Sequence, residues 1–290
     1  MTSNLIDGKK LAEKVRKNLK KEIDGFKKKP ELVVILVGEN PSSQIYVRNK
    51  IRYAKEVGIK SDVIKFSDDV SEKHLLKTIE KLNKNKKVSG ILVQLPLPKH
   101  IDEFKVINCI KPEKDVDGFT VKNKGLLMLK KPRLVPCTPL GIMDILKSNK
   151  VNVAGKLAVV VGRSDIVGKP MAQLLLNSDA TVVQCHSKTK NLSDVTSKAD
   201  ILISAVGKRN LITGKHVKNG AVVIDVAMIR DEKNKKWIGD VNFEQVSKKA
   251  KLITPVPGGV GPMTVAMLLK NTVDAYKQQN NKNKNEIETF

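Results

Sequence analysis

A glycine-containing loop in the second half of the chain constrains the fold most. The loop reads Gly162-Arg163-Ser164-Asp165-Ile166-Val167-Gly168-Lys169-Pro170; it follows the apolar run 157–161 and precedes the apolar run 171–176. A strand, a glycine turn and a helix in this order place free backbone N–H groups and a helix dipole against a phosphate. Plain strand-to-helix connections can have the same pattern, so the loop alone leaves both interpretations open.

Two segments indicate which cofactor such a loop would take. An arginine such as Arg163 can form a two-pronged contact with a phosphate monoester, which favours NADP over NAD. NAD enzymes normally carry Asp or Glu after the next strand, where it binds the ribose 2′-hydroxyl. This chain has Ser187, Lys188 and Thr189 there instead. Arg163 and Ser187 would suit a 2′-phosphate, so both segments predict NADP.

Length and composition set the broad class of the protein. The chain has 290 residues, enough for two modest domains, and is 40% hydrophobic but only 3% aromatic, so we expect aliphatic cores. We find no apolar run of transmembrane length and no signal peptide, and we expect a cytoplasmic protein without a membrane partner. The cysteines and histidines lack metal-ligand spacing, so we expect no metal site and no disulfide framework.

The formal net charge of +24 is typical of a nucleic-acid-binding protein. Lysine is nevertheless spread along the whole chain and accompanied by asparagine, and few aromatic residues are available for base stacking. We therefore expect no nucleic-acid partner. The positive field would instead attract phosphorylated cofactors and polyanionic substrates.

Alternating strand and helix patterns predict two α/β units with mostly parallel sheets, the second a doubly wound Rossmann-type domain. The elements expected in the first half are helix 5–29, strand 32–37, a helix from Ser42 or Ser43 to about 57, strand 62–66, helix 71–83 and strand 90–95. A loop-rich junction between Pro112 and Pro139 leads to a helix that ends near 149. The elements expected in the second unit are strands 157–161, 181–185, 201–205, 221–226 and 252–253, and helices 170–178 and 192–198. A last helix, 263–276, is expected to return from the second unit and could pack against the first. Polar sequence beyond about 277 is expected to be disordered.

One face of the second expected helix carries polar groups that could do chemistry. Ser43, Tyr46 and Lys50 are spaced three and then four residues apart, so they share a face. A partly desolvated lysine beside a tyrosine can act in proton transfer. The alternative is a solvated lysine, like Lys55 on the same helix.

Two loops of the first half place polar groups where ligands bind in parallel sheets. Gln94, Leu95 and Pro96 stand at the carboxyl end of a buried strand, although an ordinary strand end would look the same. Asp115 and Asp117 lie in a turn that ends at Gly118. They could stabilise that turn, or one of them could accept hydrogen bonds from a ring with N–H donors. A metal site there would lack further ligands.

The segment 254–264 mixes prolines, glycines and apolar residues between the last strand and the last helix. Its glycines, Gly258 and Gly259 among them, allow close backbone approach to a ligand, while its prolines stiffen the rest. We expect a ligand-facing loop here rather than a linker.

Together, these motifs resemble the bifunctional methylenetetrahydrofolate dehydrogenase/methenyltetrahydrofolate cyclohydrolase family from about Gly8 to Met267. The resemblance rests on Ser43-x-x-Tyr46-x-x-x-Lys50, Val93–Pro98, Pro112–Gly118, Cys137-Thr138-Pro139, Gly162–Pro170 and Pro257–Thr264. It implies a folate-binding catalytic domain of residues 1–137 with 263–284, an NADP-binding domain of residues 138–262, a cleft between them and a disordered tail 285–290. It also implies a homodimer, tetrahydrofolate derivatives as substrates, and roles in one-carbon metabolism and in purine, methionine and histidine biosynthesis.

The resemblance further implies residue roles. Lys50, Gln94, Tyr46 and Asp117 would be catalytic, with Lys50 needed above all for the cyclohydrolase step. The substrate-binding residues would be Ser43, Tyr46, Gln94, Leu95, Pro96, Asp117, Pro257, Gly258 and Gly259. The cofactor-binding residues would be Gly162, Arg163, Ser164, Val167, Gly168, His186, Ser187, Thr189, Ala205, Val206, Gly207, Asp225, Val226, Ala227 and Thr264.

The chain departs from the family pattern at Ala227, where a glycine is usual, so the nicotinamide geometry could differ there. Residues 228–236 are unusually charged and could form the tip of a hairpin. Three alternatives remain: a dehydrogenase without cyclohydrolase activity, a basic nucleic-acid-binding or surface-binding protein, and a nucleotide sensor without turnover. The intact set of Tyr46, Lys50 and Gln94 argues against the first.

Overall fold

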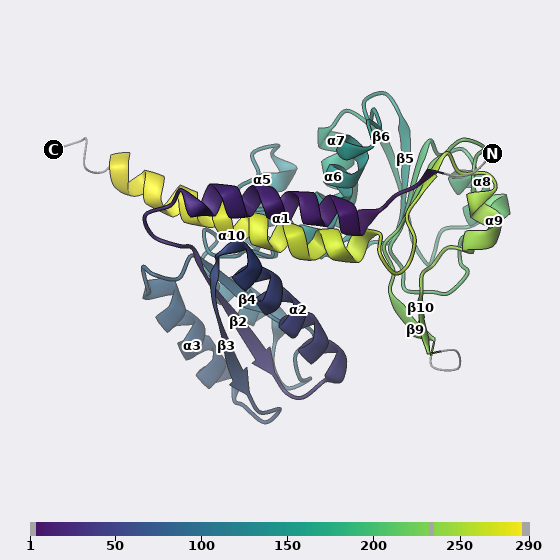
Figure 1. Ribbon diagram of the computed structural model, residues 1–290. Coiled ribbons are helices and arrows are strands. Elements are labelled where there is room, and N and C mark those ends of the chain that lie inside the picture. Colours follow the sequence, from purple (N-terminus) through teal and green to yellow (C-terminus); the bar gives the residue numbers. More distant parts are fainter. Residues whose placement is uncertain (1–3, 232–234, 286–290) are drawn as a thin grey trace. The chain divides into compact units, whose positions relative to one another are not determined.

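The structure is a computed structural model that describes residues 4–231 and 235–285 (Figure 1). The chain divides into two compact units. The 138–264 unit comprises Thr138–Thr264 together with the residues up to Glu13. The 14–137 unit comprises Lys14–Cys137 together with the residues from Val265 onward. Helix α1 (Gly8–Asp24) and helix α10 (Val260–Asn285) each contribute residues to both units.

By its contacts, the described chain up to Glu13 groups with the 138–264 unit. Strand β1 (Asn4–Leu5) pairs in parallel with β11 (Leu252–Ile253). A Cβ atom added to Gly8 would lie 1.8 Å from the carbonyl oxygen of Gly259, so the two backbones are in close contact. The expected helix 5–29 is therefore wrong at both ends, because its first residues pair in a sheet and α1 ends at Asp24.

The 14–137 unit contains a parallel sheet with the strand order β3-β2-β4. Its strands are β2 (Glu31–Val37), β3 (Lys60–Phe66) and β4 (Gly90–Val93). Val33 and Ile35 of β2 pair with Ile91 and Val93 of β4, and all four are buried in one apolar cluster. Alternate residues of a strand share a face, so this register builds the core of the unit.

Helices cover this sheet, and their ends follow local capping rules. The helices that lie entirely within this unit are α2 (Pro41–Val57), α3 (Glu72–Lys84), α4 (Glu103–Cys109) and α5 (Val121–Met128). The expected N-cap of α2 at Ser42 or Ser43 is wrong: Asn40 caps the helix and accepts a 3.1 Å hydrogen bond from Ser43 N. Ser71 caps α3, which buries Leu75 and Ile79 one turn apart.

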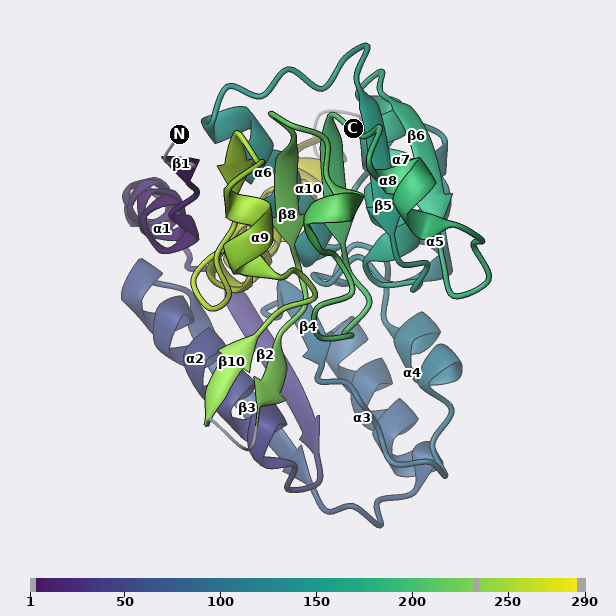
Figure 2. The same cartoon turned by 90° about the vertical axis from the view of Figure 1, so that its right-hand side faces the viewer.

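The 138–264 unit contains a parallel sheet with the strand order β1-β11-β8-β7-β5-β6 (Figure 2). Its remaining strands are β5 (Leu157–Val161), β6 (Thr181–Cys185), β7 (Ile201–Ser204) and β8 (Val222–Asp225). Strands β6 and β7 lie on opposite sides of β5, so the direction of winding reverses there. In open α/β sheets this reversal marks the place where ligands bind, beyond the carboxyl ends of the strands.

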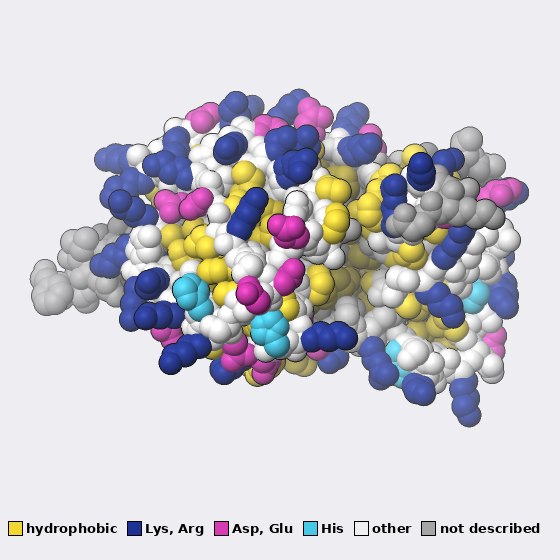
Figure 3. Space-filling view, turned by 90° about the horizontal axis from the view of Figure 1, so that it is seen from below, with side chains coloured by type: hydrophobic (Ala, Val, Ile, Leu, Met, Phe, Trp, Pro, Cys, Tyr) yellow, Lys and Arg dark blue, Asp and Glu magenta, His cyan; other side chains and the backbone are white. Residues whose placement is uncertain are grey.

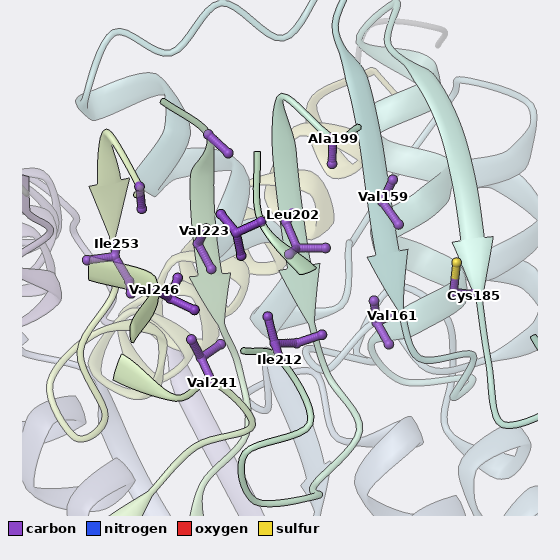
Figure 4. Close-up of a cluster of buried hydrophobic side chains, with 13 residues drawn as sticks. Val159, Val161, Cys185, Ala199, Leu202, Ile212, Val223, Val241, Val246 and Ile253 are labelled. Carbon is purple, nitrogen blue, oxygen red and sulfur yellow. The ribbon is translucent and has the colours of Figure 1, made fainter. Parts of the chain in front are cut away.

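Cross-strand rows of apolar residues form the core of this unit. Val159, Leu202, Val223 and Ile253 are register partners on neighbouring strands and are all buried (Figure 4). The helices of this unit are α6 (Cys137–Ser148, whose first residue belongs to the other unit), α7 (Gly168–Asn177), α8 (Leu192–Thr196) and α9 (Phe243–Ser247), with a 3₁₀ turn at Gly214–His216. An antiparallel hairpin, β9 (Ile229–Asp231) and β10 (Lys236–Ile238), forms from the unusually charged segment.

Several short elements were not expected from the sequence. Helices α4, α5 and α9 lie in segments without a strong apolar period, and α5 interrupts the expected loop-rich junction. Each begins at a polar cap, namely Asp102, Thr120 and Asn242, whose side chain accepts a backbone N–H three residues later.

The expected disorder beyond residue 277 is wrong for the residues up to 285. Helix α10 continues to Asn285, and Gln279 Nε2 donates to the carbonyl oxygens of Ser89 and Glu113 at 2.8 and 3.0 Å. Of the tail expected at 285–290, residues 286–290 lie outside the described residues. None of the described helices is long and apolar enough to cross a membrane.

Candidate active site

Lys50 and Gln94 meet at the carboxyl edge of the sheet in the 14–137 unit. Lys50 lies on α2, and Gln94 directly follows β4. The Lys50 ammonium group donates a 3.0 Å hydrogen bond to Gln94 Oε1. Gln94 Nε2 donates to the Leu95 carbonyl at 2.7 Å, and Gln94 N donates to the Ile35 carbonyl at 2.9 Å. With its amide nitrogen and backbone both bonded, Gln94 can direct only its side-chain oxygen toward Lys50.

The two carboxylates of the turn that ends at Gly118, Asp115 and Asp117, have different surroundings. The buried Asp115 side chain accepts hydrogen bonds from Phe119 N, Thr120 N and Asn123 Nδ2 at 3.1, 2.8 and 2.8 Å. Asp115 therefore stabilises the turn. Burial raises the pKa of Asp117 to about 6, against the opposing effect of the nearby Lys50 charge. Asp117 is the carboxylate that remains available to a ligand with N–H donors.

A buried polar network holds the Asp117 turn in place. Asn271 Nδ2 donates to the carbonyls of Val116 and Val135, at 2.8 Å each. The Cys137 thiol donates to the Val116 carbonyl at 3.3 Å and contacts Asp117 Oδ1 at 3.7 Å. Burial and the Asp117 charge raise the pKa of Cys137 well above its ordinary value, so it remains a neutral thiol. Asn271 was missed; a buried polar residue within the apolar face of the last helix is the signal that points to it.

The other predicted residues of this unit lie on the same two segments. Tyr46 is half-buried on α2, and burial raises the pKa of its phenol, which keeps it protonated. Ser43 is buried in the first turn of α2. Leu95 is half-buried, and Pro96 is exposed and follows a cis peptide bond. The sequence placed these residues correctly on a helix face and a strand end.

The glycine loop of the 138–264 unit is closed by its own backbone. Gly162 has a φ of 131°, and a Cβ atom on Gly168 would lie 2.4 Å from the Gly162 carbonyl oxygen. Ser164 Oγ accepts hydrogen bonds from Val167 N and Gly168 N at 3.3 and 3.2 Å. Glycine at these positions permits the tight strand-to-helix turn that a bound phosphate requires.

Arg163 and the turn 186–189 follow neighbouring strands that end at the same edge. Val161 of β5 pairs with Cys185 of β6, and Arg163 and Ser187 each stand two residues further on. His186 N donates to Thr189 Oγ1, and Thr189 N donates to the His186 carbonyl, both at 2.8 Å. The Arg163 side chain is exposed and, within the described part of the chain, bonds to no other residue. The pair can hold a phosphate monoester at this edge.

Asp240 and Asp225 shape the next loop of the predicted cofactor site. The buried Asp240 carboxylate accepts hydrogen bonds from Ser204 Oγ, Val206 N and Lys208 N at 2.8, 2.8 and 2.7 Å. It thereby fixes the segment that contains the predicted residues Ala205, Val206 and Gly207. Asp240 was missed, because nothing in the sequence links it to a segment more than thirty residues earlier.

The Asp225 carboxylate forms its hydrogen bonds within the 138–264 unit. It accepts hydrogen bonds from Ala227 N, Asp240 N and Val241 N at 3.2, 3.0 and 2.9 Å. Burial raises the pKa of Asp225 to about 6. Val226 and Ala227 are half-buried beside it, and the backbone of Ala227 is not in the left-handed region. The alanine therefore costs no backbone strain in place of the usual glycine.

The loop 254–264 is held at both ends. Thr254 Oγ1 accepts a 2.8 Å hydrogen bond from Asp225 N, and Thr264 Oγ1 lies 3.0 Å from Thr138 Oγ1. Between them, Pro257 follows a cis peptide bond and is exposed, Gly258 has a φ of 107° and Gly259 is buried. These predicted substrate residues belong to the 138–264 unit, whereas Lys50, Gln94 and Asp117 belong to the 14–137 unit.

The described residues contain no cluster of three or more His, Cys, Asp or Glu side chains that could hold a metal ion. The side chains of Lys50, Gln94, Tyr46 and Asp117 can donate or accept hydrogen bonds, and the backbone N–H groups of the glycine loop can bind a phosphate.

Comparison with known proteins assigns both parts of the chain to domains of one family. A family model described as the catalytic domain of tetrahydrofolate dehydrogenase/cyclohydrolase matches residues 6–117, and the NAD(P)-binding domain of the same family matches residues 136–280. The bifunctional protein FolD of Lactococcus lactis subsp. cremoris is 55% identical over 285 residues, covering 97% of this chain and 100% of the relative. That of Streptococcus mutans is 56% identical over 277 residues, covering 94% and 97%.

Solved structures agree with the sequence relatives. The bifunctional enzyme FolD of Campylobacter jejuni matches with a TM-score of 0.94 and 48% identity, covering 95% of this chain and 99% of that one. The FolD of Trypanosoma brucei, complexed with NADP cofactor and an inhibitor, matches with a TM-score of 0.91 and 39% identity, covering 96% and 98%. The expected two-domain α/β fold and the expected family are both confirmed, and this chain belongs to the tetrahydrofolate dehydrogenase/cyclohydrolase family.

Proposed function

We propose that this protein is a bifunctional enzyme of one-carbon metabolism. It oxidises 5,10-methylenetetrahydrofolate to 5,10-methenyltetrahydrofolate with NADP⁺ and then hydrolyses that cation to 10-formyltetrahydrofolate. The observation that carries the proposal is the hydrogen bond between Lys50 and Gln94 beside the Asp117 carboxylate, in a chain of this family. A dehydrogenase without cyclohydrolase activity would not need this pair.

The residues of the glycine loop fit NADP. Bound NADP⁺ supplies the hydride acceptor. A Cβ atom at Gly162 or Gly168 would lie 2.4 Å from a backbone carbonyl oxygen of the chain itself, so glycine at both positions permits the tight turn that directs backbone N–H groups toward the diphosphate. Arg163 and Ser187 hold the 2′-phosphate, and the loop fixed by Asp240 lines the same edge of the sheet. These residues bind and orient the cofactor, which reduces the entropic part of the barrier to hydride transfer.

Lys50 transfers protons during the hydrolysis. Water adds to the methenyl carbon and must lose a proton, and a ring nitrogen must gain one before the ring opens. The Gln94 side-chain oxygen holds the Lys50 ammonium group in one direction, from which it can relay protons between these positions. Asp117 accepts hydrogen bonds from N–H groups of the pterin ring, and Tyr46 covers the ring from α2. Ser43, Leu95 and Pro96, with Pro257, Gly258 and Gly259, complete the substrate contacts.

We further propose a cytoplasmic homodimer that acts on small-molecule tetrahydrofolate derivatives and has neither a nucleic-acid nor a membrane partner. We also propose that its activity serves purine, methionine and histidine biosynthesis, as the family resemblance implies. Analytical ultracentrifugation of the purified protein tests the dimer, since a single species at the monomer mass of 32.1 kDa would contradict it.

Turnover with purified protein tests the two activities. The protein is mixed with 5,10-methylenetetrahydrofolate and either NADP⁺ or NAD⁺, and NADPH (or NADH) and 10-formyltetrahydrofolate are followed separately. We expect both products with NADP⁺ and much slower reduction of NAD⁺. NADPH formation while methenyltetrahydrofolate opens no faster than without protein would leave only the dehydrogenase.

A further inference from the structure

A hollow lies within the 14–137 unit, away from Lys50 and Gln94. It has a volume of about 850 Å³, and its wall includes Glu31, Lys60 and Ser89, which lie at the start of β2, at the start of β3 and just before β4. Gln94 follows the last residue of β4, so the hollow opens at the opposite edge of the sheet. The four residues of β4 separate the two edges by roughly 13 Å, at about 3.3 Å per residue. The hollow is thus a separate site.

Lysine side chains surround this hollow without partners. They include Lys27 and Lys28 after α1, Lys60 at the start of β3, Lys84 at the end of α3, and Lys86 and Lys87 just after that helix. Within the described residues, none of these six ammonium groups forms an ion pair or a side-chain hydrogen bond. Other lysines of the chain do form ion pairs, such as Lys218 with Asp200 at 2.7 Å.

The hollow has little negative charge of its own. Of the two carboxylates in its wall, Glu31 and Glu113, the second lies 3.7 Å from Arg133. Like charges held together repel each other, and a bound anion would remove that repulsion. Figure 3 shows that, on the face of the molecule seen from below, Lys and Arg side chains are interspersed with Asp and Glu.

Lys114 adds a buried donor to the same wall. It is only 5% exposed, and its ammonium group donates to the carbonyls of Leu82 and Asn85 at 3.0 and 2.7 Å. An ammonium group has three N–H donors, so one remains for a ligand. Burial and the neighbouring Lys111 lower the pKa of Lys114 to about 8, which still leaves it mostly protonated at neutral pH.

The size and composition of the hollow indicate the class of its ligand. A volume of about 850 Å³ is typical of small-molecule sites. Its one aromatic side chain, Tyr276, packs on Phe26 with ring centroids 5.1 Å apart, so no row of aromatic faces is offered to nucleobases. Lysine binds phosphate groups as a compact point charge. We propose that this hollow binds a small polyanion that carries several phosphate groups, at a site distinct from the folate and cofactor sites.

Titration calorimetry with inorganic tripolyphosphate tests the proposal on the full-length protein at low salt. We expect a saturable binding event that weakens as salt is added. The double substitution Lys84→Glu with Lys86→Glu should weaken it at least about tenfold, because two attractions become repulsions. Lys73→Glu with Lys77→Glu, on exposed positions nearer the start of α3, changes the net charge equally and should alter the affinity less than about twofold. Dehydrogenase activity should be unchanged in both double variants, which shows that both are folded.

Several results would overturn this site. They are no saturable binding, an equal loss in both double variants, equally tight binding of citrate, or tighter binding of a long single-stranded oligonucleotide. Complete loss of binding in Arg163→Ala would assign the phosphate to the cofactor loop instead. Turnover does not enter this titration, so its outcome is independent of the proposed function.

Discussion

The Lys50 ammonium group and the Gln94 side-chain oxygen are 3.0 Å apart, although 44 positions separate them in the chain. The parallel sheet produces this contact, because Gln94 follows β4 at the edge where α2 presents Lys50. The Gln94 amide is itself held by the Leu95 carbonyl. Lys50 is therefore oriented by a group with no freedom to turn away.

Replacing Lys50 tests its role in proton transfer. We expect Lys50→Met to lower the cyclohydrolase rate by about 10²–10⁴-fold, the usual contribution of general acid–base catalysis. Dehydrogenase activity should fall much less, since hydride transfer depends on positioning. Lys55→Met, at an exposed position near the end of the same helix, is the matched control and should leave both rates unchanged. Equal loss of both activities in Lys50→Met would assign Lys50 to substrate binding alone.

Neutralising Asp115 and neutralising Asp117, in the turn that ends at Gly118, should change the free energy of unfolding in opposite directions. Burial raises the pKa of Asp117 to about 6 from 3.8, so the ionised form is disfavoured in the folded state. The stability that the protonated group provides is present below about pH 4 and is lost as the pH rises through 6. Asp117→Asn should thus raise the free energy of unfolding at pH 7 by up to about 3 kcal/mol, and the gain should vanish near pH 4.

Asp115→Asn is the matched comparison. Its carboxylate accepts two backbone N–H groups and the Asn123 amide, so this change should lower the free energy of unfolding by about 1–3 kcal/mol at pH 7. Urea unfolding of both variants across this pH range measures the difference. Destabilisation by Asp117→Asn at pH 7 would contradict this prediction, because it would show that burial does not disfavour the ionised Asp117 carboxylate in the folded state.

Arg163 should determine the preference for NADP⁺. Arg163→Ala removes a charge-assisted contact worth about 1.5–3 kcal/mol, so the KM for NADP⁺ should rise by roughly 10–100-fold. The KM for NAD⁺ should change less than about twofold. The control is Lys169→Ala, whose ammonium group pairs with Asp165 at 2.6 Å and should not affect either value. A parallel rise for both cofactors would place Arg163 on the diphosphate.

Gly168 should tolerate no side chain. A Cβ atom there would lie 2.4 Å from the Gly162 carbonyl oxygen, so Gly168→Ala should open the loop, weaken NADP⁺ binding and cost about 1–3 kcal/mol of stability. Gly125→Ala in α5 meets no atom within 4 Å and should stabilise the protein by about 0.4–1 kcal/mol. Thermal unfolding with and without NADP⁺ measures both effects, and a neutral Gly168→Ala would contradict the tight turn.

Asp240 should act on the cofactor through the segment 204–208. Asp240→Asn replaces a carboxylate that accepts three hydrogen bonds, so we expect a loss of about 1–3 kcal/mol in stability and weaker NADP⁺ binding. Lys208→Ala keeps the backbone N–H that bonds to Asp240 and should bind NADP⁺ normally. Unchanged cofactor affinity in a destabilised Asp240→Asn would limit Asp240 to a structural role.

The local sequence pattern was sufficient to predict the strands and the helix face that carry the candidate site residues. The bounds of β5, β6 and β11 are those expected from sequence, because parallel strands are short, largely apolar runs between turn residues. The face that carries Tyr46 and Lys50 follows from helical spacing alone. Arg163 and Ser187 could be paired in advance, since successive parallel strands end at one edge. The family followed from the order of these motifs.

Long-range contacts decided the rest. The sequence placed Asp115 and Asp117 in one turn but could not say which carboxylate is used for the turn's own hydrogen bonds. In the structure that carboxylate is Asp115, which accepts from the Asn123 amide and from the N–H groups of Phe119 and Thr120. Asp240 reaches a loop 32 to 36 residues earlier, and Gln279 bonds to a carbonyl 190 residues earlier. A polar side chain far along the chain gives no local signal of its partner. The sequence alone thus determined most of the strands, the helix face that carries Lys50 and the family, whereas tertiary packing determined which polar groups are satisfied internally and which remain for a ligand.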